Sequence, residues 1–265
     1  MFSLTLECSA EEKDLVSAEL WSRGAAGITE TDLPENRTRL QAFFEESACD
    51  PAALAEEFAT YHPQPRQEPD TDWVRVSREA WQPIEVGERF FLVPDWRGDP
   101  TPPGRLRLET HPGRACGTGA HPATQLSLEA MERHVRPGDA VLDVGTGSGI
   151  LSVAAKLLGA GLVVACDIDP DAVEVADANI HRDDIEVGLF VGSIRSVRSG
   201  SIDVIVANIN AASIVGLAQE FARTGRTTIV TGFTEGEQAG VARALGLKPV
   251  ESFSKQEWAC LVFRL

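Results

Sequence analysis

The sequence predicts an α/β protein in which a small α+β domain precedes a larger domain built on a doubly wound parallel sheet. A strand, a glycine-rich turn, a helix and a second strand follow one another along Ala140–Pro170, the order typical of half of such a sheet. The N-terminal residues instead follow the order strand, helix, strand, strand, helix, which is most of a ferredoxin-like split βαβ. Three prolines within Tyr61–Thr71 indicate a linker between the two patterns. We therefore expect domains at 1–62 and 81–265, joined by a linker at 63–80.

The elements of the first domain follow from hydrophobic spacing and capping residues. Ser9 followed by Glu12 predicts a capped helix start, and Asp50 before Pro51 predicts another, because proline suits the first helical position. The expected elements are a strand Phe2–Glu7, a helix Ala10–Arg23, strands Gly27–Thr31 and Thr38–Phe44, a helix from Pro51 to about Ala59, and a minimal fourth strand near Arg66–Glu68. The small size of this domain favours recognition over catalysis.

The larger domain opens with aromatic residues in a strand pattern over Trp81–Trp96 and a short strand at Leu106–Glu109. We expect the tryptophans to pack the linker against this domain, since a tryptophan cluster more often belongs to a core than to a ligand site. The remaining expected elements complete the sheet: a buried strand ending at Asn208, a strand Gly225–Gly232, a helix Glu235–Leu245, and an antiparallel pair of Pro249–Phe253 with Trp258–Arg264.

Composition restricts the class of partner. The chain has 265 residues, enough for one large or two modest domains, and its 43% hydrophobic and 24% charged content is ordinary for a soluble globular protein. The formal net charge of −16 disfavours direct binding to a nucleic-acid phosphate backbone and favours attraction of a basic protein.

Cysteine usage and hydropathy indicate the compartment. The five cysteines are scattered without a C-x-x-C pair, which argues against a disulfide framework and against a zinc site. The N-terminus lacks the pattern of a signal peptide, and the most apolar segment, Ile150–Cys166, is too short to span a bilayer. We expect a soluble, cytoplasmic protein with no bound metal and no membrane contact.

Gly145-Thr-Gly-Ser-Gly149 carries the clearest binding signal. Its glycines let the backbone approach a ligand, and N–H groups near Gly145 and Gly147 suit a carboxylate. Asp167, at the end of the second strand, can accept hydrogen bonds from both hydroxyls of a ribose. A dinucleotide fingerprint has glycine where this chain has Ile150, which disfavours an NAD enzyme. The alternative is a plain βαβ unit with a glycine-rich turn.

Two further polar residues stand at the expected ligand edge of the sheet. Thr124 begins an amphipathic helix that runs through His134, so its hydroxyl can face a ligand. Asn208 ends a buried strand, where its side chain can accept a hydrogen bond from an amine and aim the amine's lone pair; the alternative is an Asn that only caps the strand. His121 has no second ligand at metal spacing, which favours a structural role.

The glycine motif and the following Asp resemble the G-x-G-x-G motif of S-adenosylmethionine-dependent methyltransferases. Three further features make the resemblance specific to one family of these methyltransferases. They are the loop CGTGAHPAT at 116–124, the DIDP that ends the second strand, and the upstream pattern DW…W-x-P-x-x-x-G…P-x-W. Together with LDVGTGSGIL, they resemble the bacterial family of methyltransferases that act on ribosomal protein eleven of the large subunit. The resemblance covers essentially the whole chain.

This resemblance implies a seven-stranded Rossmann-like methyltransferase domain and S-adenosylmethionine as cofactor. It also implies methylation of lysine side chains, the N-terminal amine or both on one small basic ribosomal protein, which the N-terminal domain recognises while the linker lets the catalytic domain reorient. By resemblance, Thr124, Gly145, Gly147, Asp167 and Asn208 contact the cofactor, and Asn208 is also the catalytic residue beside the amine. No side chain stands out as a general base, so we expect the amine to lose its proton to water, helped by desolvation.

The chain departs from the family pattern in the loop and after the buried strand. The departures are Cys116, Ala120, Ala123, Asn210 and the segment Thr110–Gly113, which replaces a DPG. Besides the protein-lysine methyltransferase, two alternatives stay open: a methyltransferase of another acceptor, such as another protein's lysine or a nucleic-acid base, and a non-catalytic binding module with the same fold. The acidic composition and the lack of a basic–aromatic patch disfavour RNA.

Overall fold

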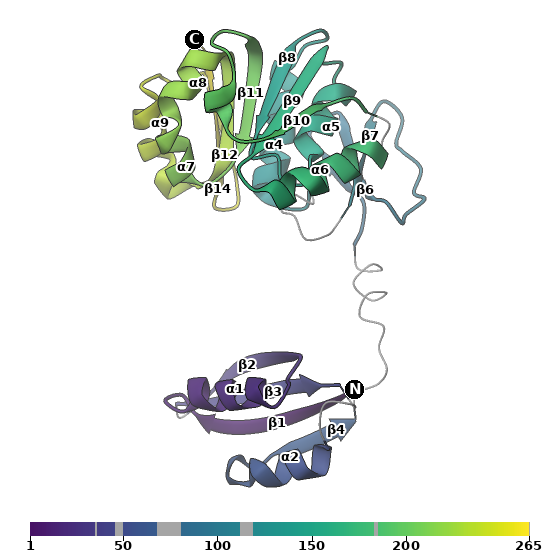
Figure 1. Ribbon diagram of the computed structural model, residues 1–265, viewed down its shortest axis with the longest axis vertical. Helices are drawn as coiled ribbons and strands as arrows, with labels where there is room; N and C mark the ends of the chain where they lie inside the picture. Colours follow the sequence, from purple (N-terminus) through teal and green to yellow (C-terminus); the bar gives the residue numbers. More distant parts are fainter. Residues whose placement is uncertain (35, 46–49, 68–80, 112–118, 183–184, 265) are drawn as a thin grey trace. The chain divides into compact units, whose positions relative to one another are not determined.

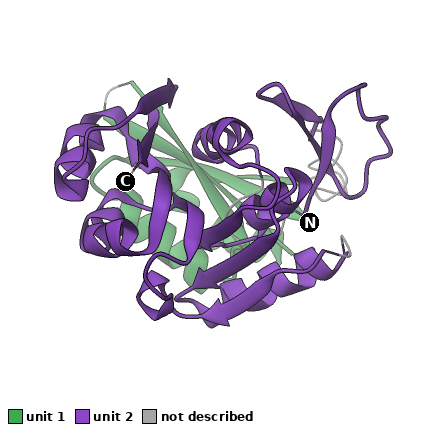
Figure 2. Cartoon of the chain, turned by 90° about the horizontal axis from the view of Figure 1, so that it is seen from above, with its two compact units in different colours: residues 1–80 green, residues 81–265 purple. Residues whose placement is uncertain are grey.

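The computed structural model describes residues 1–34, 36–45, 50–67, 81–111, 119–182 and 185–264. The chain divides into two compact units, Met1–Ala80 and Trp81–Leu265 (Figure 2). Each unit has hydrophobic clusters of its own. Among the described residues, no helix has both the length and the apolar character needed to cross a membrane.

The first unit is a four-stranded antiparallel sheet in the order β2-β3-β1-β4 with two helices. Alternate residues of β1 share one face of the sheet, where they pack with Val16 and Leu20 from the first helix and Leu54 from the second. Both helices therefore cover the same face. The elements are β1 (Phe2–Ser9), α1 (Lys13–Ser22), β2 (Gly27–Leu33), β3 (Arg37–Phe44), α2 (Pro51–Glu57), a 3₁₀ turn (Ala59–Tyr61) and β4 (Gln64–Gln67).

Helix α1 begins at Lys13, three residues later than the sequence predicts. Ser9 and Glu12 do form the expected reciprocal pair: the Glu12 N–H donates to Ser9 Oγ at 3.3 Å, and the Ser9 N–H donates to the Glu12 carboxylate at 3.4 Å. This pair closes a turn ahead of the helix. The prediction for α2 holds, because the Asp50 carboxylate accepts from the Ala52 N–H at 3.1 Å and Pro51 occupies the first turn.

Strand β4 occupies the start of the segment that the sequence analysis assigns to the linker. It pairs with β1 from Phe2 opposite Gln67 to Thr5 opposite Gln64. Pro65 is tolerated because β4 is an edge strand, where a missing N–H need not break a ladder. The proline content that indicates a linker therefore also fits a short edge strand. The rest of that segment, residues 68–80, lies outside the described residues.

The second unit contains the predicted seven-stranded sheet, in the order β10-β9-β8-β11-β12-β14-β13 (Figure 1). The first five strands are parallel, and the last two form an antiparallel pair. In chain order the strands are β8 (Ala140–Val144), β9 (Leu162–Asp167), β10 (Gly188–Val191), β11 (Ile202–Asn208), β12 (Gly225–Thr234), β13 (Glu251–Lys255) and β14 (Trp258–Arg264).

Helices cover both faces of this sheet. The helices are α4 (Pro122–His134), α5 (Ile150–Leu157), α6 (Pro170–Arg182), α7 (Ala211–Gly216), α8 (Ala218–Thr224) and α9 (Gln238–Leu245), with 3₁₀ turns at Ile194–Ser196 and Glu235–Glu237. Val204 and Val206 of β11 point into the core beneath α4 and α5, whereas Ile205 points into the core beneath α7, α8 and α9. Because successive side chains of a strand point to opposite faces of the sheet, the buried strand β11 contributes residues to both hydrophobic cores.

A small sheet precedes α4. It consists of β5 (Ile84–Val86), β6 (Phe90–Pro94) and β7 (Leu106–Thr110), with β6 and β7 parallel. The tryptophans that bracket the first two strands pack together, since the Trp81 and Trp96 rings lie 6.4 Å apart at an interplanar angle of 70°. Both rings are partly buried, and the predicted packing of the linker against them falls on residues 68–80, outside the described residues.

Candidate active site

The carboxyl ends of β8 and β11 mark the point where the strand order reverses, and ligands of doubly wound sheets bind there. Directly after β8, the backbone turns at Gly145, which has φ of +74°. A Cβ at this position would overlap Cγ2 of Ile209. The Gly145 N–H donates to the carbonyl of Cys166 at 2.8 Å, which ties the turn to β9. Glycine is therefore required by both conformation and space.

Asp167 lies against this turn, as the sequence predicts. Its Oδ2 accepts from the Gly147 N–H at 3.1 Å and its Oδ1 accepts from the Asp169 N–H at 3.1 Å. The N–H groups of Gly145 and Gly147 therefore both have acceptors within the protein. Contact of these glycines with a ligand carboxylate stays a prediction, and both glycines line the cleft without a side chain.

A cleft of about 810 Å³ opens beside the turn, within the size range of cofactor sites. It contains three of the five residues predicted from the sequence, Gly145, Gly147 and Asp167. On the side of α6 the cleft is lined by three carboxylates, those of Asp169, Asp171 and Glu174. On the side of α7 it is lined by both polar and apolar side chains. The lining residues are Val144, Gly145, Gly147, Asp167, Ile168, Asp169, Asp171, Ala172, Glu174, Val175, Gly192, Ser193, Ile209, Asn210, Ser213 and Leu217.

The other two predicted residues, Thr124 and Asn208, meet each other beside this cleft. Asn208 Nδ2 donates to Thr124 Oγ1 at 3.2 Å, with Thr124 fully buried and Asn208 partly exposed. Neither residue lines the cleft, but Ile209, the next residue after Asn208, does. The hydrogen bond fixes the amide of Asn208, so that its Oδ1 is the atom left to accept from a ligand.

A bulge in β12 holds the other side of Asn208. The pairing of β12 with β14 shifts register between Val230 and Phe233, and Gly232 within the shift has φ of +90°. A Cβ at Gly232 would lie 2.5 Å from the Ile209 carbonyl oxygen and 2.9 Å from Asn208 Oδ1. Thr231 Oγ1 lies 2.6 Å from Ser127 Oγ of α4, which anchors the bulge to the same helix that carries Thr124.

Asp143 is a functional candidate that the sequence reasoning missed. It is fully buried in β8, and its Oδ2 accepts from Thr146 Oγ1 at 2.8 Å and from Ser152 Oγ at 2.7 Å. Burial raises the pKa of this carboxyl to about 6, and the two hydroxyl donors oppose that rise. The available signal was an acidic residue two places before the first glycine, in a strand that otherwise looks apolar.

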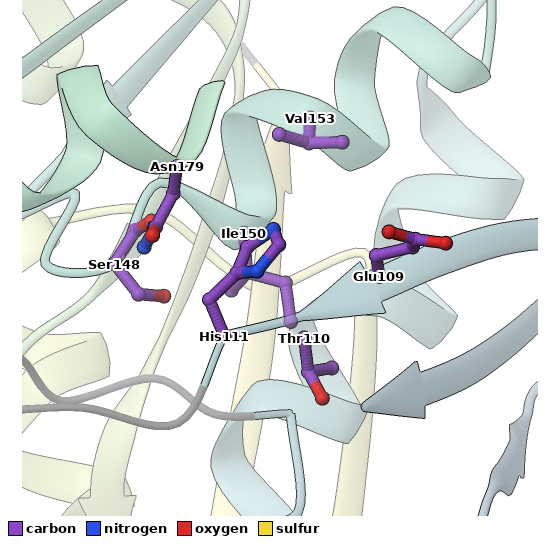
Figure 3. Close-up of a pocket in the computed structure, with 7 residues that line it drawn as sticks. All are labelled: Glu109, Thr110, His111, Ser148, Ile150, Val153 and Asn179. Atoms are coloured by element: carbon purple, nitrogen blue, oxygen red, sulfur yellow. The ribbon is translucent and has the colours of Figure 1, made fainter. Parts of the chain in front are cut away.

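A second, very small pocket lies behind the turn (Figure 3). Its volume of about 10 Å³ is room for about one water molecule. Asn179 Nδ2 of α6 donates to the Ser148 carbonyl at 2.9 Å, and His111 Nδ1 at the end of β7 lies 2.9 Å from Asp95 Oδ2. The first contact ties α6 to the glycine turn, and the second joins the ends of β6 and β7 on the other side of the pocket.

The remaining predicted residues have structural roles or fall outside the description. His121 caps α4, because its Nδ1 accepts from the Ala123 N–H at 3.2 Å, and its ring lies 4.5 Å from that of Trp258. Asn210 caps α7 by accepting from the Ser213 N–H at 2.9 Å. Cys116 and the rest of the loop 112–118 lie outside the described residues. No group of three or more metal-binding side chains occurs among the residues that the structure describes.

Comparison with known proteins identifies the family. The model of the family described as "Ribosomal protein L11 methyltransferase (PrmA)" matches residues 1–265. The chain belongs to this family. The ribosomal protein L11 methyltransferase of Cupriavidus taiwanensis is 37% identical over 250 residues, covering 90% of this chain and 83% of that protein. The one from Geobacter sulfurreducens is 41% identical over 201 residues, covering 74% and 67%.

A solved structure agrees with the family assignment. The ribosomal protein L11 methylase of Lactobacillus delbrueckii subsp. bulgaricus superimposes with a TM-score of 0.63 at 29% sequence identity. The match covers 69% of this chain and 99% of that one. The resemblance inferred from the glycine motif, the loop and the tryptophan pattern is thus confirmed, and so are the seven-stranded core and the methyltransferase class of the enzyme.

Proposed function

We propose that this chain transfers methyl groups from S-adenosylmethionine to amines of ribosomal protein L11. The observation that carries the proposal is the match of the family to residues 1–265, which includes both units rather than the catalytic fold alone. The amines we propose are lysine side chains, the N-terminal amine, or both. The chemistry of the cleft and of Asn208 supports this reaction.

The cleft suits S-adenosylmethionine in three respects. The carboxylate of Asp167 lies at its edge and can accept from a ribose diol. Gly145 and Gly147 present no side chain, so the methionine part can lie close to the backbone. The carboxylates of Asp169, Asp171 and Glu174 give the α6 wall a negative charge that attracts a sulfonium cation. Contact of Thr124 and Asn208 with the cofactor remains a prediction.

We propose that Asn208 directs the amine. When bound, S-adenosylmethionine supplies a methyl carbon made electrophilic by the sulfonium. The lone pair of the amine nitrogen would form the new bond to this carbon, and the electron pair of the breaking carbon–sulfur bond would go to sulfur. Because Asn208 Nδ2 donates to Thr124 Oγ1, the Asn208 Oδ1 would be the atom that accepts one N–H of the amine and aims the lone pair. Desolvation favours the neutral form of the amine, and the proton that its ammonium form carries leaves to water.

We propose that the first unit is a ferredoxin-like substrate-recognition domain. Its element order β1-α1-β2-β3-α2-β4 and its sheet order support the fold. Acidic residues outnumber basic ones by more than two to one within residues 1–67, which favours a basic protein and disfavours direct contact with nucleic acid.

The experiment that tests the proposal is transfer of a labelled methyl group to purified L11, beside a mixture of cellular proteins, with Asp167→Ala as the control. We expect label on L11 with the wild-type enzyme and its loss with the variant, because the ribose would lack its acceptor. Label on another protein only, or measurable cofactor binding without any transfer, would contradict the proposal.

A further inference from the structure

Helix α1 has an unusual outer face. The side of the helix that faces the sheet carries Val16 and Leu20, both fully buried. The opposite side carries Leu15, Ala18 and Trp21, and Leu15 and Trp21 are 62% and 52% exposed. Residues three apart on a helix are neighbours, so these three form one continuous apolar strip. A helix on the surface of a monomer usually has a polar outer face.

The strip is distinctive within its unit. Among the described residues, the large apolar side chains that are strongly exposed in the first unit are Leu15 and Trp21 alone, and both belong to α1. Tryptophan is the residue type most often found at the energetic centre of a protein interface. Contiguous exposed apolar surface of this kind marks a docking site more often than an accident of packing.

The rim of the strip is acidic. Glu11, Asp14 and Glu19 are exposed around it, and none of them forms an ion pair with any residue in the described part of the chain. The basic side chains at the two ends of α1 already have partners, because Lys13 pairs with Glu30 of β2 at 2.9 Å and Arg23 pairs with Glu57 of α2. The face therefore presents apolar contact area with uncompensated negative charge.

The other face of the same sheet is a poorer candidate. Its charges lie on the side of β1 and β3 away from the helices and pair with each other. Glu7 binds Arg37 at 2.7 Å and Arg39 at 2.6 Å. The pairing of Arg39 holds the pKa of Glu7 below its usual value, so the carboxylate is already satisfied.

We propose that the outer face of α1, formed by Leu15, Ala18, Trp21, Asp14 and Glu19 together with Glu11 of the preceding turn, is the surface that docks the protein substrate. The partner that fits it has an apolar patch edged with lysine or arginine, and this inference rests on the proposed function in taking L11 as that partner. Docking there brings the substrate to the enzyme before its amine reaches Asn208. The face therefore sets the KM for the protein substrate and leaves the chemical step unchanged.

The test is the steady-state kinetics of methyl transfer to purified L11 by the double variant Leu15→Ser/Trp21→Ala. We expect the KM for L11 to rise at least tenfold, with kcat and the Kd for S-adenosylmethionine within twofold of wild type. The matched control is Leu162→Ser in β9 of the second unit, which removes an apolar side chain of equal exposure, 52%, and should leave all three constants unchanged. The melting temperature of each variant confirms folding.

A second variant isolates the charge. Asp14→Asn/Glu19→Gln should raise the KM for L11 severalfold and reduce its dependence on salt, because the attraction is screened in the wild type. If both sets of variants leave the KM within twofold of wild type, the surface does not dock the substrate and the inference is wrong. If they lower kcat instead, the face acts in the catalytic cycle and not in docking. If the wild-type enzyme does not methylate L11, the proposed function fails first and the inference with it.

Discussion

Asp143 links the glycine-rich turn of the active site to the stability of the folded protein. Its carboxylate holds the hydroxyls of Thr146 in the turn and Ser152 in α5, at the cost of being fully buried. Its other oxygen, Oδ1, has no hydrogen-bond partner among the described residues. The raised pKa is the consequence, because the protonated form loses less on burial than the charged form does.

The pH dependence of stability tests this description. The pKa of Asp143 is about 6 in the folded state and near 3.8 in the unfolded state, so the folded protein binds the proton more tightly. The free energy of unfolding contributed by this group therefore falls as the pH rises from about 4 to 6, by roughly 3 kcal/mol. Urea unfolding of the wild type and of Asp143→Asn between pH 4.5 and 7.5 should show a fall that the variant lacks. Parallel curves would contradict the assignment.

At the scale of elements, the bulge in β12 connects three parts of the site. Thr231 is hydrogen-bonded to α4, Gly232 leaves room for Asn208 and Ile209, and Ile209 covers Gly145. Asn208 is thus held between α4 on one side and β12 on the other. The position of its amide depends on the bulge as much as on its own strand.

A single methyl group at Gly232 should disturb this arrangement. In Gly232→Ala, the new Cβ would meet the Ile209 backbone and Asn208 Oδ1, and alanine is strained at a φ of +90°. We expect a loss of about 1–3 kcal/mol in the free energy of unfolding and a fall of at least tenfold in kcat. The control is Gly240→Ala in α9, where a Cβ meets nothing within 4 Å. Chemical denaturation and single-turnover methyl transfer measure the two effects; equal behaviour of the two variants would refute the role of Gly232.

The sequence predicts the central elements well and the irregular ones poorly. The strands that end at Val144, Asp167 and Asn208 follow from buried, largely β-branched runs, the last two of which end on a polar residue, and they occur where expected. The bulge could not be predicted, because Thr227–Thr231 is a β-branched run like that of a regular strand and only its pairing with β14 shows the extra residues. The pairing of Asn208 with Thr124 depends on contacts between distant segments, which sequence spacing does not reveal.

At the scale of the whole molecule, the proposed function assigns cofactor binding and catalysis to the second unit and substrate recognition to the first. The cleft, Asn208 and the bulge all belong to residues 81–265, which have their own cores. The first unit contributes a separate core and the outer face of α1. Binding of the cofactor and recognition of the protein substrate are therefore expected to be separable.

Production of residues 81–265 alone tests this separation. Since all residues that line the cleft are retained, we expect its Kd for S-adenosylmethionine to lie within about threefold of that of the full chain. We expect the kcat/KM for L11 to fall at least a hundredfold, because the surface that concentrates the substrate is absent. Calorimetric titration and labelled methyl transfer measure the two quantities. Full activity of the shortened chain on L11 would show that the first unit is not needed for recognition.

The central claim is that the cleft binds the cofactor while Asn208 directs the amine. The most direct measurement is the Kd for S-adenosylmethionine, together with kcat for L11, in Asp167→Ala and Asn208→Ala. We predict that Asp167→Ala raises the Kd at least tenfold, whereas Asn208→Ala, which removes a smaller cofactor contact, raises the Kd less than Asp167→Ala does and lowers kcat at least a hundredfold. If the two variants change the Kd equally, or if Asn208→Ala retains its kcat, the division of roles is contradicted.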